Sequence, residues 1–348
     1  MSWMIYGATG YTGTLIAETC ARRGLAPTLA GRDATKLRAL SERLNLPYVA
    51  VSLDNQLNEA LSGFDLVLHC AGPFSATAEP MMQACLATGT HYLDITGEVD
   101  VFERAAELND SARQAGIVLM PGVGFDVIPT DCVAARLKAE MPDAQSLSLG
   151  FDSRSGFSPG TAKTSVEALP KGGLIRRGGQ LTAVPLAYRQ ADIDFGNGTK
   201  HAATIPWGDV STAWHSTGIP NIEVYLPMSP RKAKQLKKLN ALRWLLGWGW
   251  VQRAIKKRIE QQVAGPDEQQ RQDSPTWVWG RAENASGEAL VARVKVANGY
   301  EVTVEGALAM VERVLSEKPC GFLTPSQLAG WQLVEQLPGS GTITLSEQ

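Results

Sequence analysis

The sequence predicts an α/β fold, in which a doubly wound domain with a parallel sheet is followed by a second α+β domain. Strand and helix patterns alternate over the first third of the 348 residues. Three glycines, Gly7, Gly10 and Gly13, separate the first strand from the first helix. From about residue 145, strands and glycine-rich turns replace this alternation. An alternating pattern is typical of a parallel sheet with helices on both faces, and the ligand of such a sheet binds at the carboxyl ends of its strands.

The elements follow in order. Six strands are expected in the first domain, at residues 2–6, 26–30, 48–53, 65–70, 91–95 and 117–120. The helices between them are expected at residues 14–22, 34–44, 56–61, 79–88 and 99–115. A helix over 132–139 leads to strands at 145–151, 191–195, 222–226, 275–283 and 289–297, and helices at 304–315 and 325–336 close the chain. The second set of strands predicts an open, mixed and mostly antiparallel sheet.

The glycine triplet has a physical explanation as a dinucleotide site. The first glycines let the chain turn sharply and let the backbone approach a phosphate, and the third lets the helix pack closely on the strand. The helix then offers its first N–H groups and its positive dipole end to an anion. A surface turn with incidental glycines is the alternative, but the strand before and the helix after favour a nucleotide.

Composition excludes several classes of protein. The formal net charge of −2 gives no overall attraction to nucleic acid. The five cysteines are dispersed, none lies in a C-x-x-C pair, and the four histidines are scattered, so we expect no metal site. Dispersed cysteines suit a reducing compartment, so we expect a cytoplasmic protein.

The end of the second strand bears on the choice between NAD and NADP. An acidic side chain there would accept hydrogen bonds from the ribose 2′-hydroxyl. This chain has Arg32 at that point and Lys36 one helical turn further on, and both favour a 2′-phosphate. NADP is therefore expected, and the neighbouring Asp33 keeps NAD as the alternative.

Four stretches together resemble the saccharopine dehydrogenase-like superfamily. They are GATGYTG, LAGRDATKL, HCAGPFSATAEPMMQACLATGTHYLDITGE and PGVGFDVIPTDC, and FSPGTAKTSVEAL resembles the family more weakly. The branch resembled contains the trans-acting enoyl reductases and the saccharopine dehydrogenase-like oxidoreductases. The resemblance implies a Rossmann domain, an interrupted α+β substrate domain, and a C-terminal segment that returns to the Rossmann side. We expect an NADP-binding domain at 1–130, a substrate and dimerisation domain at 131–300 with a basic helical insertion at 230–262, and a helical segment at 301–348 that packs on the first domain.

The resemblance also implies where each part of the cofactor lies. The pyrophosphate is expected at Gly7, Thr9, Gly10, Tyr11, Thr12 and Gly13, the 2′-phosphate at Arg32 and Lys36, the adenine near Asp54, and the ribose and nicotinamide at Ala71, Gly72 and Pro73. The mouth of the cleft is expected at Tyr92, Asp94, Gly97 and Glu98, with residues 122–126 facing the substrate domain.

The candidates for catalysis are Tyr92, Asp126 and Lys163, the last in a glycine-flanked turn with Thr161 and Ser165. Each has a structural alternative or a rival. His69 is a rival proton donor, but it also fits a histidine that ends a buried strand. Asp126 and Glu98 also fit helix caps, before the helix near Pro129 and at Val99 respectively.

Two exclusions narrow the chemistry. None of the seven tyrosines is followed by lysine four residues on, so the Tyr-x-x-x-Lys pair of short-chain dehydrogenases is missing. Saccharopine itself carries several carboxylates and would require an arginine cluster, for which Arg154, Arg176 and Arg177 are the candidates. An enoyl or carbonyl group on a lipid-like molecule is an equally good substrate.

Residues 231–258 contain ten lysines or arginines and no acidic residue, interleaved with leucines and with Trp244, Trp248 and Trp250. Such a segment suits peripheral contact with an anionic inner-membrane surface. It also suits a helical cover over the second sheet, with the charges in solvent.

These observations predict an NADP-dependent oxidoreductase that transfers hydride to or from a C=C, C=O or C=N bond of a small or lipid-like substrate. A homodimer is expected. A non-catalytic NADP-binding sensor is the alternative, because the residues do not single out a proton donor.

Overall fold

The computed structural model describes residues 2–54, 56–153, 169–243, 248–249, 251–252 and 274–347. The chain divides into two compact units, each built from two stretches of sequence. The first unit comprises Met1–Ile128 and Tyr300–Ala329, and the second comprises Pro129–Gly299 and Gly330–Gln348.

The first unit is built on a seven-stranded sheet in the order β15-β6-β5-β4-β1-β2-β3, and every pairing in it is parallel. Its strands are β1 (Trp3–Tyr6), β2 (Thr28–Gly31), β3 (Tyr48–Ala50), β4 (Leu66–His69), β5 (His91–Asp94), β6 (Val118–Met120) and β15 (Gly321–Phe322). The strand order reverses between β1 and β4, as in doubly wound dinucleotide-binding folds. The predicted fold class is confirmed.

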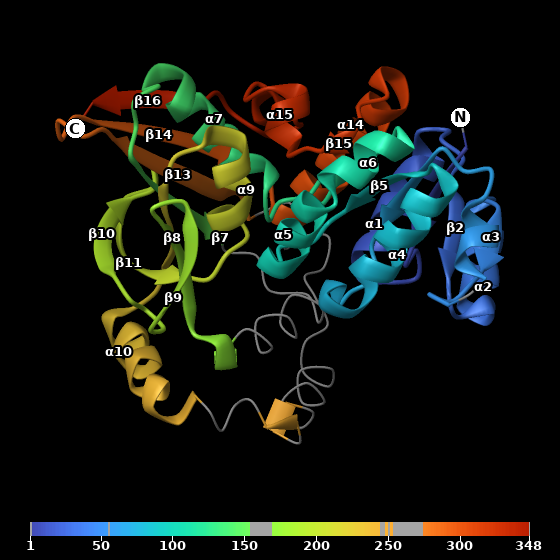
Figure 1. Ribbon diagram of the computed structural model, residues 1–348, viewed down its shortest axis with the longest axis horizontal. Coiled ribbons are helices and arrows are strands. Elements are labelled where there is room, and N and C mark those ends of the chain that lie inside the picture. Colours follow the sequence, from blue (N-terminus) through green and yellow to red (C-terminus); the bar gives the residue numbers. More distant parts are fainter. Residues whose placement is uncertain are drawn as a thin grey trace. The chain divides into compact units, whose positions relative to one another are not determined.

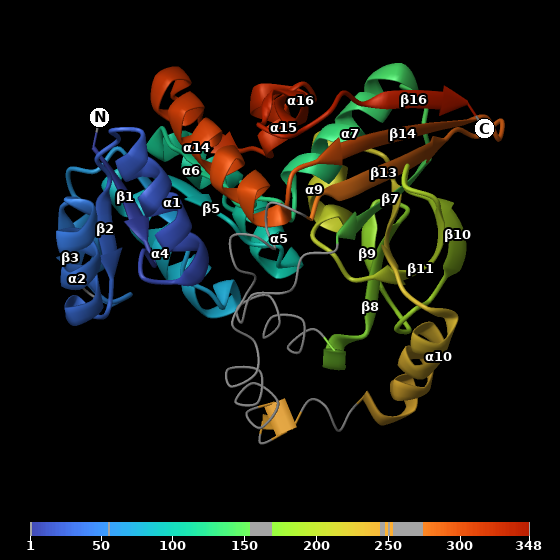
Figure 2. The same ribbon diagram turned by 180° about the vertical axis from the view of Figure 1, so that it is seen from behind.

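Helices cover both faces of this sheet (Figures 1 and 2). The side chains of Met4, Tyr6, Val67 and Tyr92 point to one face and pack against helices α3 (Leu57–Leu61), α4 (Phe74–Thr88), α5 (Val99–Glu107) and α6 (Asn109–Ala115). On the other face, Figure 2 shows α1 (Tyr11–Arg22) in front of the strands with α14 (Gly299–Glu317) beside it. Helix α2 (Ala34–Leu44) follows β2, with exactly the bounds that the sequence predicts.

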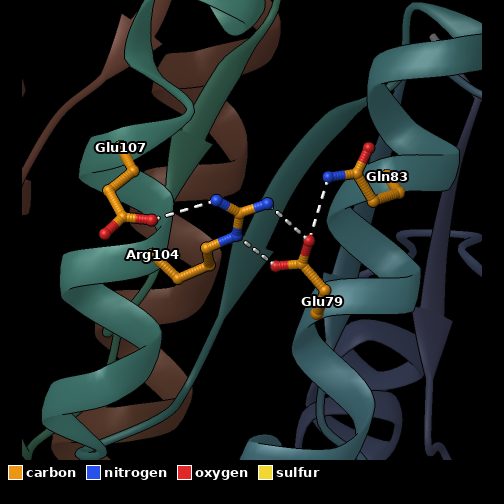
Figure 3. A network of polar contacts seen from close by, with 4 residues as sticks. All are labelled: Glu79, Gln83, Arg104 and Glu107. Carbon is orange, nitrogen blue, oxygen red and sulfur yellow. Dashed lines mark hydrogen bonds and ion pairs between the residues drawn. The ribbon is translucent and has the colours of Figure 1, made fainter.

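A network of exposed side chains joins α4 to α5 (Figure 3). The Arg104 guanidinium donates Nε–H and Nη2–H to the two carboxylate oxygens of Glu79, at 2.7 and 2.9 Å. Its Nη1 donates to Glu107 at 2.9 Å, and Gln83 donates to Glu79 at 3.0 Å. Hydrogen bonds from Arg104 lower the pKa of Glu79. Because Arg104 and Glu79 are both about two-fifths exposed, solvent screens this pair and it adds little stability.

The second unit is built on a nine-stranded mixed sheet. Its strands are β7 (Ser146–Ser153), β8 (Gly173–Arg177), β9 (Gln180–Val184), β10 (Gln190–Asp194), β11 (Thr199–Ile205), β12 (Asn221–Pro227), β13 (Thr276–Glu283), β14 (Ala289–Val296) and β16 (Thr344–Glu347). Among the strands that the structure describes in this sheet, β7 and β12 pair in parallel, and the other pairings are antiparallel. Among the described residues, the α-helices of this unit are α7 (Ile128–Glu140), α9 (Asp209–Thr217), α10 (Pro230–Leu239) and α16 (Leu333–Gln336).

The end of the chain differs from expectation. The helix expected over 325–336 is divided into α15 (Pro325–Ala329) and α16, because Gly330 has a φ of +74° and turns the chain. The segment 301–348 was expected to pack on the first domain as one piece. Residues Tyr300–Ala329 lie in the first unit, whereas Gly330–Gln348 lie in the second, where β16 pairs with β14.

Candidate nucleotide-binding site

The three glycines after β1 each occupy a place where a side chain would meet backbone. Gly7 has a φ of +84°, and a Cβ on it would lie 2.7 Å from the amide nitrogen of Ala71. A Cβ on Gly13 would lie 2.3 Å from the carbonyl oxygen of Gly7, so α1 packs directly on the turn. Gly10 is the N-cap of α1 and provides no side-chain cap, and the first turn of that helix contains no acidic residue. The turn therefore leaves the helix N-terminus suited to an anion.

The loop that follows β4 lies against this turn. Ala71 touches Gly7, so the ends of β1 and β4 meet at the point where the strand order reverses. The Glu98 carboxylate accepts the backbone N–H groups of Phe74 and Ser75 at 3.0 and 2.7 Å. The sequence offers two roles for Glu98, a cap of the helix at Val99 and a place at the mouth of the cleft. Its side chain makes no cap bond to the helix at Val99, and the bonds to Phe74 and Ser75 show that it caps α4. This cap explains why α4 begins at Phe74 and not at residue 79.

Charged side chains lie beyond the ends of β2 and β3. Arg32 is exposed, and among the described residues it forms no hydrogen bond or ion pair. The Asp33 carboxylate accepts the Lys36 N–H at 3.1 Å and is the N-cap of α2, and this hydrogen bond lowers the pKa of Asp33. The Lys36 ammonium lies 3.6 Å from the same carboxylate. Burial raises the pKa of the Tyr6 hydroxyl. The charge of Arg32 lowers the same pKa and the charge of Asp54 raises it, so both charges lie near the end of β1.

Tyr92 and Asp94 form a buried pair at the end of β5. Both side chains are fully buried, and the Tyr92 hydroxyl donates to Asp94 Oδ2 at 2.5 Å. Asp94 Oδ1 also accepts the N–H groups of Thr96 and Gly122, each at 2.9 Å. Burial raises the pKa of Asp94 to about 7 and that of Tyr92 well above its ordinary value. Tyr92, a predicted catalytic residue, therefore belongs to the core of the first unit and does not offer its hydroxyl to a substrate.

His69 is also a core residue. Its ring lies 5.5, 5.3 and 6.1 Å from the rings of Tyr6, Phe74 and Tyr92. The Thr77 hydroxyl donates to the Ala71 carbonyl at 2.6 Å and lies 3.0 Å from His69 Nε2, so this network assigns the imidazole proton to Nε2. Burial lowers the pKa of His69 to about 3, which keeps the ring neutral. The imidazole thus supports the loop after β4 through Thr77.

Residues 122–126 form a loop, called the 122–126 loop below. It contains Asp126, the remaining catalytic candidate of the first unit. The Asp94 carboxylate binds the N–H of Gly122, and the Asp94 carbonyl accepts the N–H of Val123 at 2.7 Å. The Asp126 carboxylate lies against Gly97, where an added Cβ would come within 2.8 Å of Oδ2. Burial raises the pKa of Asp126 to about 7, although part of the residue stays exposed. A largely buried carboxyl that titrates near neutrality can give or take a proton.

The predicted residues of the second domain divide into two groups. Lys163, Thr161, Ser165 and Arg154 lie outside the described residues. Arg176 is buried and donates to the carbonyls of Val210 and Gly179 at 2.6 and 2.8 Å. Arg177 donates to the Tyr188 hydroxyl at 3.0 Å. Arg176 therefore anchors backbone within the second unit and is not available to a substrate carboxylate.

The described part of the basic segment packs on the second sheet. Ala233 and Leu236 of α10 contact Ala187 and Ala203, while the helix exposes Arg231, Lys232, Lys234, Lys237 and Lys238. Trp248 is 45% exposed, and Trp244 and Trp250 lie outside the described residues. Among the helices that the structure describes, none is long and apolar enough to cross a membrane. Within the same described ranges, no three His, Cys, Asp or Glu side chains are grouped as a metal site would require.

The sequence did not indicate Tyr300 or Thr303, which bring the returning helix α14 to this site. The Tyr300 ring lies 4.9 Å from that of Tyr11, and the Thr303 hydroxyl accepts the Phe125 N–H at 3.0 Å. No local pattern marks either residue, because both contacts span well over 150 positions in the chain.

An open parallel sheet with a glycine turn at the reversal of strand order defines a dinucleotide-binding Rossmann domain. Comparison with known proteins identifies its kind. Residues 3–120 match the family described as the saccharopine dehydrogenase NADP binding domain. The resemblance stated from the sequence is confirmed.

Two relatives illustrate the match. A saccharopine dehydrogenase-like oxidoreductase of Mus musculus is 30% identical over 150 residues, which cover 37% of this chain and 35% of that protein. A trans-acting enoyl reductase of Mycobacterium ulcerans is 31% identical over 138 residues, which cover 37% of this chain and 33% of that protein. The match thus spans about a third of the length of these relatives.

Solved structures share the fold over the whole chain. Saccharopine dehydrogenase (L-Glu forming) from Saccharomyces cerevisiae has a TM-score of 0.69 at 12% identity, covering 100% of this chain and 99% of its own. Homospermidine synthase from Legionella pneumophila, solved with NAD, has a TM-score of 0.70 at 10% identity, covering 100% of this chain and 91% of its own. At these identities the likeness concerns the fold alone.

Proposed function

We propose that the protein is an NADP-dependent oxidoreductase that transfers hydride between NADP(H) and a C=C, C=O or C=N bond. The observation that carries this proposal is the glycine turn packed against Ala71 at the strand-order reversal, which presents the N-terminus of α1, without a side-chain cap, to a pyrophosphate. The family of residues 3–120 supports the same cofactor class.

The preference for NADP over NAD follows from Arg32 and Asp33. Arg32 is exposed at the end of β2 and has no ion-pair partner among the described residues, so it is available to a 2′-phosphate. The Asp33 carboxylate already accepts the Lys36 N–H as a helix cap, which removes the acidic residue that would favour NAD.

Asp126 is the proposed proton donor. In the reducing direction, hydride from the nicotinamide adds to one atom of the double bond, and the proton of the Asp126 carboxyl goes to the other atom. The pKa of about 7 supports this role, because both protonation states are then populated at neutral pH. In the oxidising direction the carboxylate takes the proton back.

The proposed substrate is weakly charged. Arg176 is engaged with backbone carbonyls, so it gives no support to a substrate with several carboxylates. An enoyl or carbonyl group on a lipid-like molecule fits better, and the name of the mycobacterial relative supports an enoyl group.

The test is a comparison of nucleotide binding with turnover. NADPH should bind more tightly than NADH by calorimetry, and at least one of a panel of enoyl thioesters, quinones and 2-oxo acids should oxidise NADPH. Gly10→Val should abolish nucleotide binding, because the side chain fills the phosphate space. An added Cβ would lie 3.2 Å from the Gly7 carbonyl oxygen, a tight contact that a shift of a few tenths of an ångström relieves, so the fold should persist. Tight NADPH binding with no turnover and a co-purifying partner would support a redox sensor instead.

Membrane contact is a separate proposal. Helix α10 exposes five cations, of which Arg231, Lys234 and Lys238 follow one another at the spacing of one helix face. Each cation near an anionic lipid surface contributes about 1 kcal/mol, screened by salt. The protein should then float with phosphatidylglycerol vesicles at low salt and dissociate at high salt. A protein that ignores such vesicles at low salt would leave α10 only as a cover of the second sheet.

A further inference from the structure

The first turns of α14 contact two different loops of the first unit. The Tyr300 ring packs edge-on to Tyr11, which lies in the first turn of α1 beside the glycine turn. Thr303 accepts the Phe125 N–H within the 122–126 loop. Residues three apart share one face of a helix, so a single face of α14 touches both loops.

The contact with the 122–126 loop is closely packed. Thr303 is 9% exposed, and a Cβ on Gly124 would lie 2.9 Å from its Cγ2. One turn further along α14, a Cβ on Gly306 would lie 2.5 Å from the Ile128 side chain. Neither the loop nor the helix can move closer, and a shift away would break the hydrogen bond from Phe125.

The other end of the loop is held by β5. Asp94 accepts the N–H of Gly122 through its carboxylate and that of Val123 through its carbonyl. The 122–126 loop is therefore fixed at its start by Asp94 of β5 and at its end by a helix that returns 178 residues later. Asp126 is the residue directly after Phe125.

We propose that Thr303 is a positioning residue that holds the 122–126 loop, and with it Asp126, through the Phe125 amide. Tyr300, on the same helix face, positions the nucleotide-binding turn through Tyr11. Helix α14 thus fixes the positions of the nucleotide-binding turn and the 122–126 loop relative to each other. The consequence for catalysis rests on the proposed role of Asp126, whereas the positioning itself does not.

Thr303→Val tests the hydroxyl, because it preserves the shape of the side chain and removes the acceptor. Hydrogen exchange of the Phe125 amide should become about tenfold faster, as expected for the loss of a partly buried hydrogen bond. The kcat of NADPH-dependent reduction should fall about tenfold with the KM for NADPH unchanged. Thr303→Ser restores the hydroxyl and should restore both values.

Ser316→Ala is the matched control. Ser316 lies on the same helix, and its hydroxyl donates to the Arg313 carbonyl at 3.0 Å in an exposed position far along the helix from the loop. This variant should change neither Phe125 exchange nor turnover.

Tyr300→Leu tests the second contact without relying on the first. Loss of the ring contact with Tyr11 should weaken NADPH binding about fivefold, the size of an aromatic pair. An unchanged Kd would overturn the role given to Tyr300.

The outcomes separate this inference from the proposed function. Unchanged Phe125 exchange in Thr303→Val, or failure of Thr303→Ser to restore it, would overturn the positioning role whatever Asp126 does. Faster exchange together with full activity of Asp126→Asn would support positioning and refute the proton-donor role. If Thr303→Val does not fold, the exchange rate in Thr303→Ala decides the question in the same way.

Discussion

The two ends of the candidate site differ in how their charged side chains meet solvent. At the end of β2, Arg32, Asp33 and Lys36 are exposed, and Asp33 shows a lowered pKa through a hydrogen bond from the first turn of α2. At the ends of β5 and β6, desolvation raises the pKa of Asp94 and of Asp126 to about 7. The exposed end can select a cofactor by charge at little cost in stability. The buried end fixes the geometry of a loop and raises the pKa of its carboxyl groups.

The largest effect is expected at the buried end. Asp94→Ala leaves three donors without their acceptor, namely the Tyr92 hydroxyl and the N–H groups of Thr96 and Gly122. The free energy of unfolding should fall by about 3–5 kcal/mol, since each unsatisfied buried donor costs about 1–3 kcal/mol. Urea denaturation measures this loss. Asp94→Asn keeps an acceptor oxygen and should lose clearly less, and equal losses would contradict the hydrogen-bond explanation.

At the exposed end, Arg32→Ala should change cofactor choice and leave stability almost unaltered. A charge-assisted pair with a phosphate is worth about 1.5–3 kcal/mol, so the Kd for NADPH should rise about 10- to 150-fold while that for NADH stays constant. Isothermal calorimetry with both nucleotides measures the change. Arg43→Ala is the control, because Arg43 is exposed on the same α2 helix and pairs with Glu18 at 2.7 Å. An equal loss for both nucleotides would show that Arg32 does not bind the 2′-phosphate.

The pH dependence of stability sharpens the same contrast. The pKa of Asp94 is about 7 in the folded state against an ordinary value of 3.8 for an aspartate side chain, so folding favours the protonated form. This contribution is fully present below pH 3.8 and is lost as the pH rises through about 7. Asp94 should therefore make the protein less stable at pH 8 than at pH 6 by about 1 kcal/mol. Asp94→Asn should remove that part of the dependence of the unfolding free energy on pH. An unchanged dependence would show that it comes from a group other than Asp94.

The smallest effect is expected for Asp33→Ala. It removes an exposed helix cap and should lower stability less than Asp94→Asn does, measured under the same denaturation conditions. The affinity for NADH should not change, because the Asp33 carboxylate is engaged by α2. A selective loss of NADH binding would instead assign this carboxylate to the ribose hydroxyl.

The strands of the first unit could be predicted because each is marked by a local pattern in the sequence. Strands such as β1 and β4 are buried along their whole length and therefore appear as continuous apolar runs between turn residues. In the second unit, β9 and β16 are mostly exposed or half-buried and carry no such run, so the sequence did not predict them. The single helix expected over 99–115 is divided at Leu108 into α5 and α6, a boundary that apolar spacing does not mark.

The sequence by itself determined the glycine turn, since the positive φ of Gly7 and the close packing at Gly13 follow from adjacent elements. It also determined the charge at Arg32. Only the tertiary structure decided that Tyr92 lies in the core, that Glu98 caps α4, and that Thr303 reaches Phe125 from 178 residues away. Dihedral preference and charge are properties of a residue and its neighbours, whereas burial, the pKa of a carboxyl and the partner of an amide depend on which distant segments surround it.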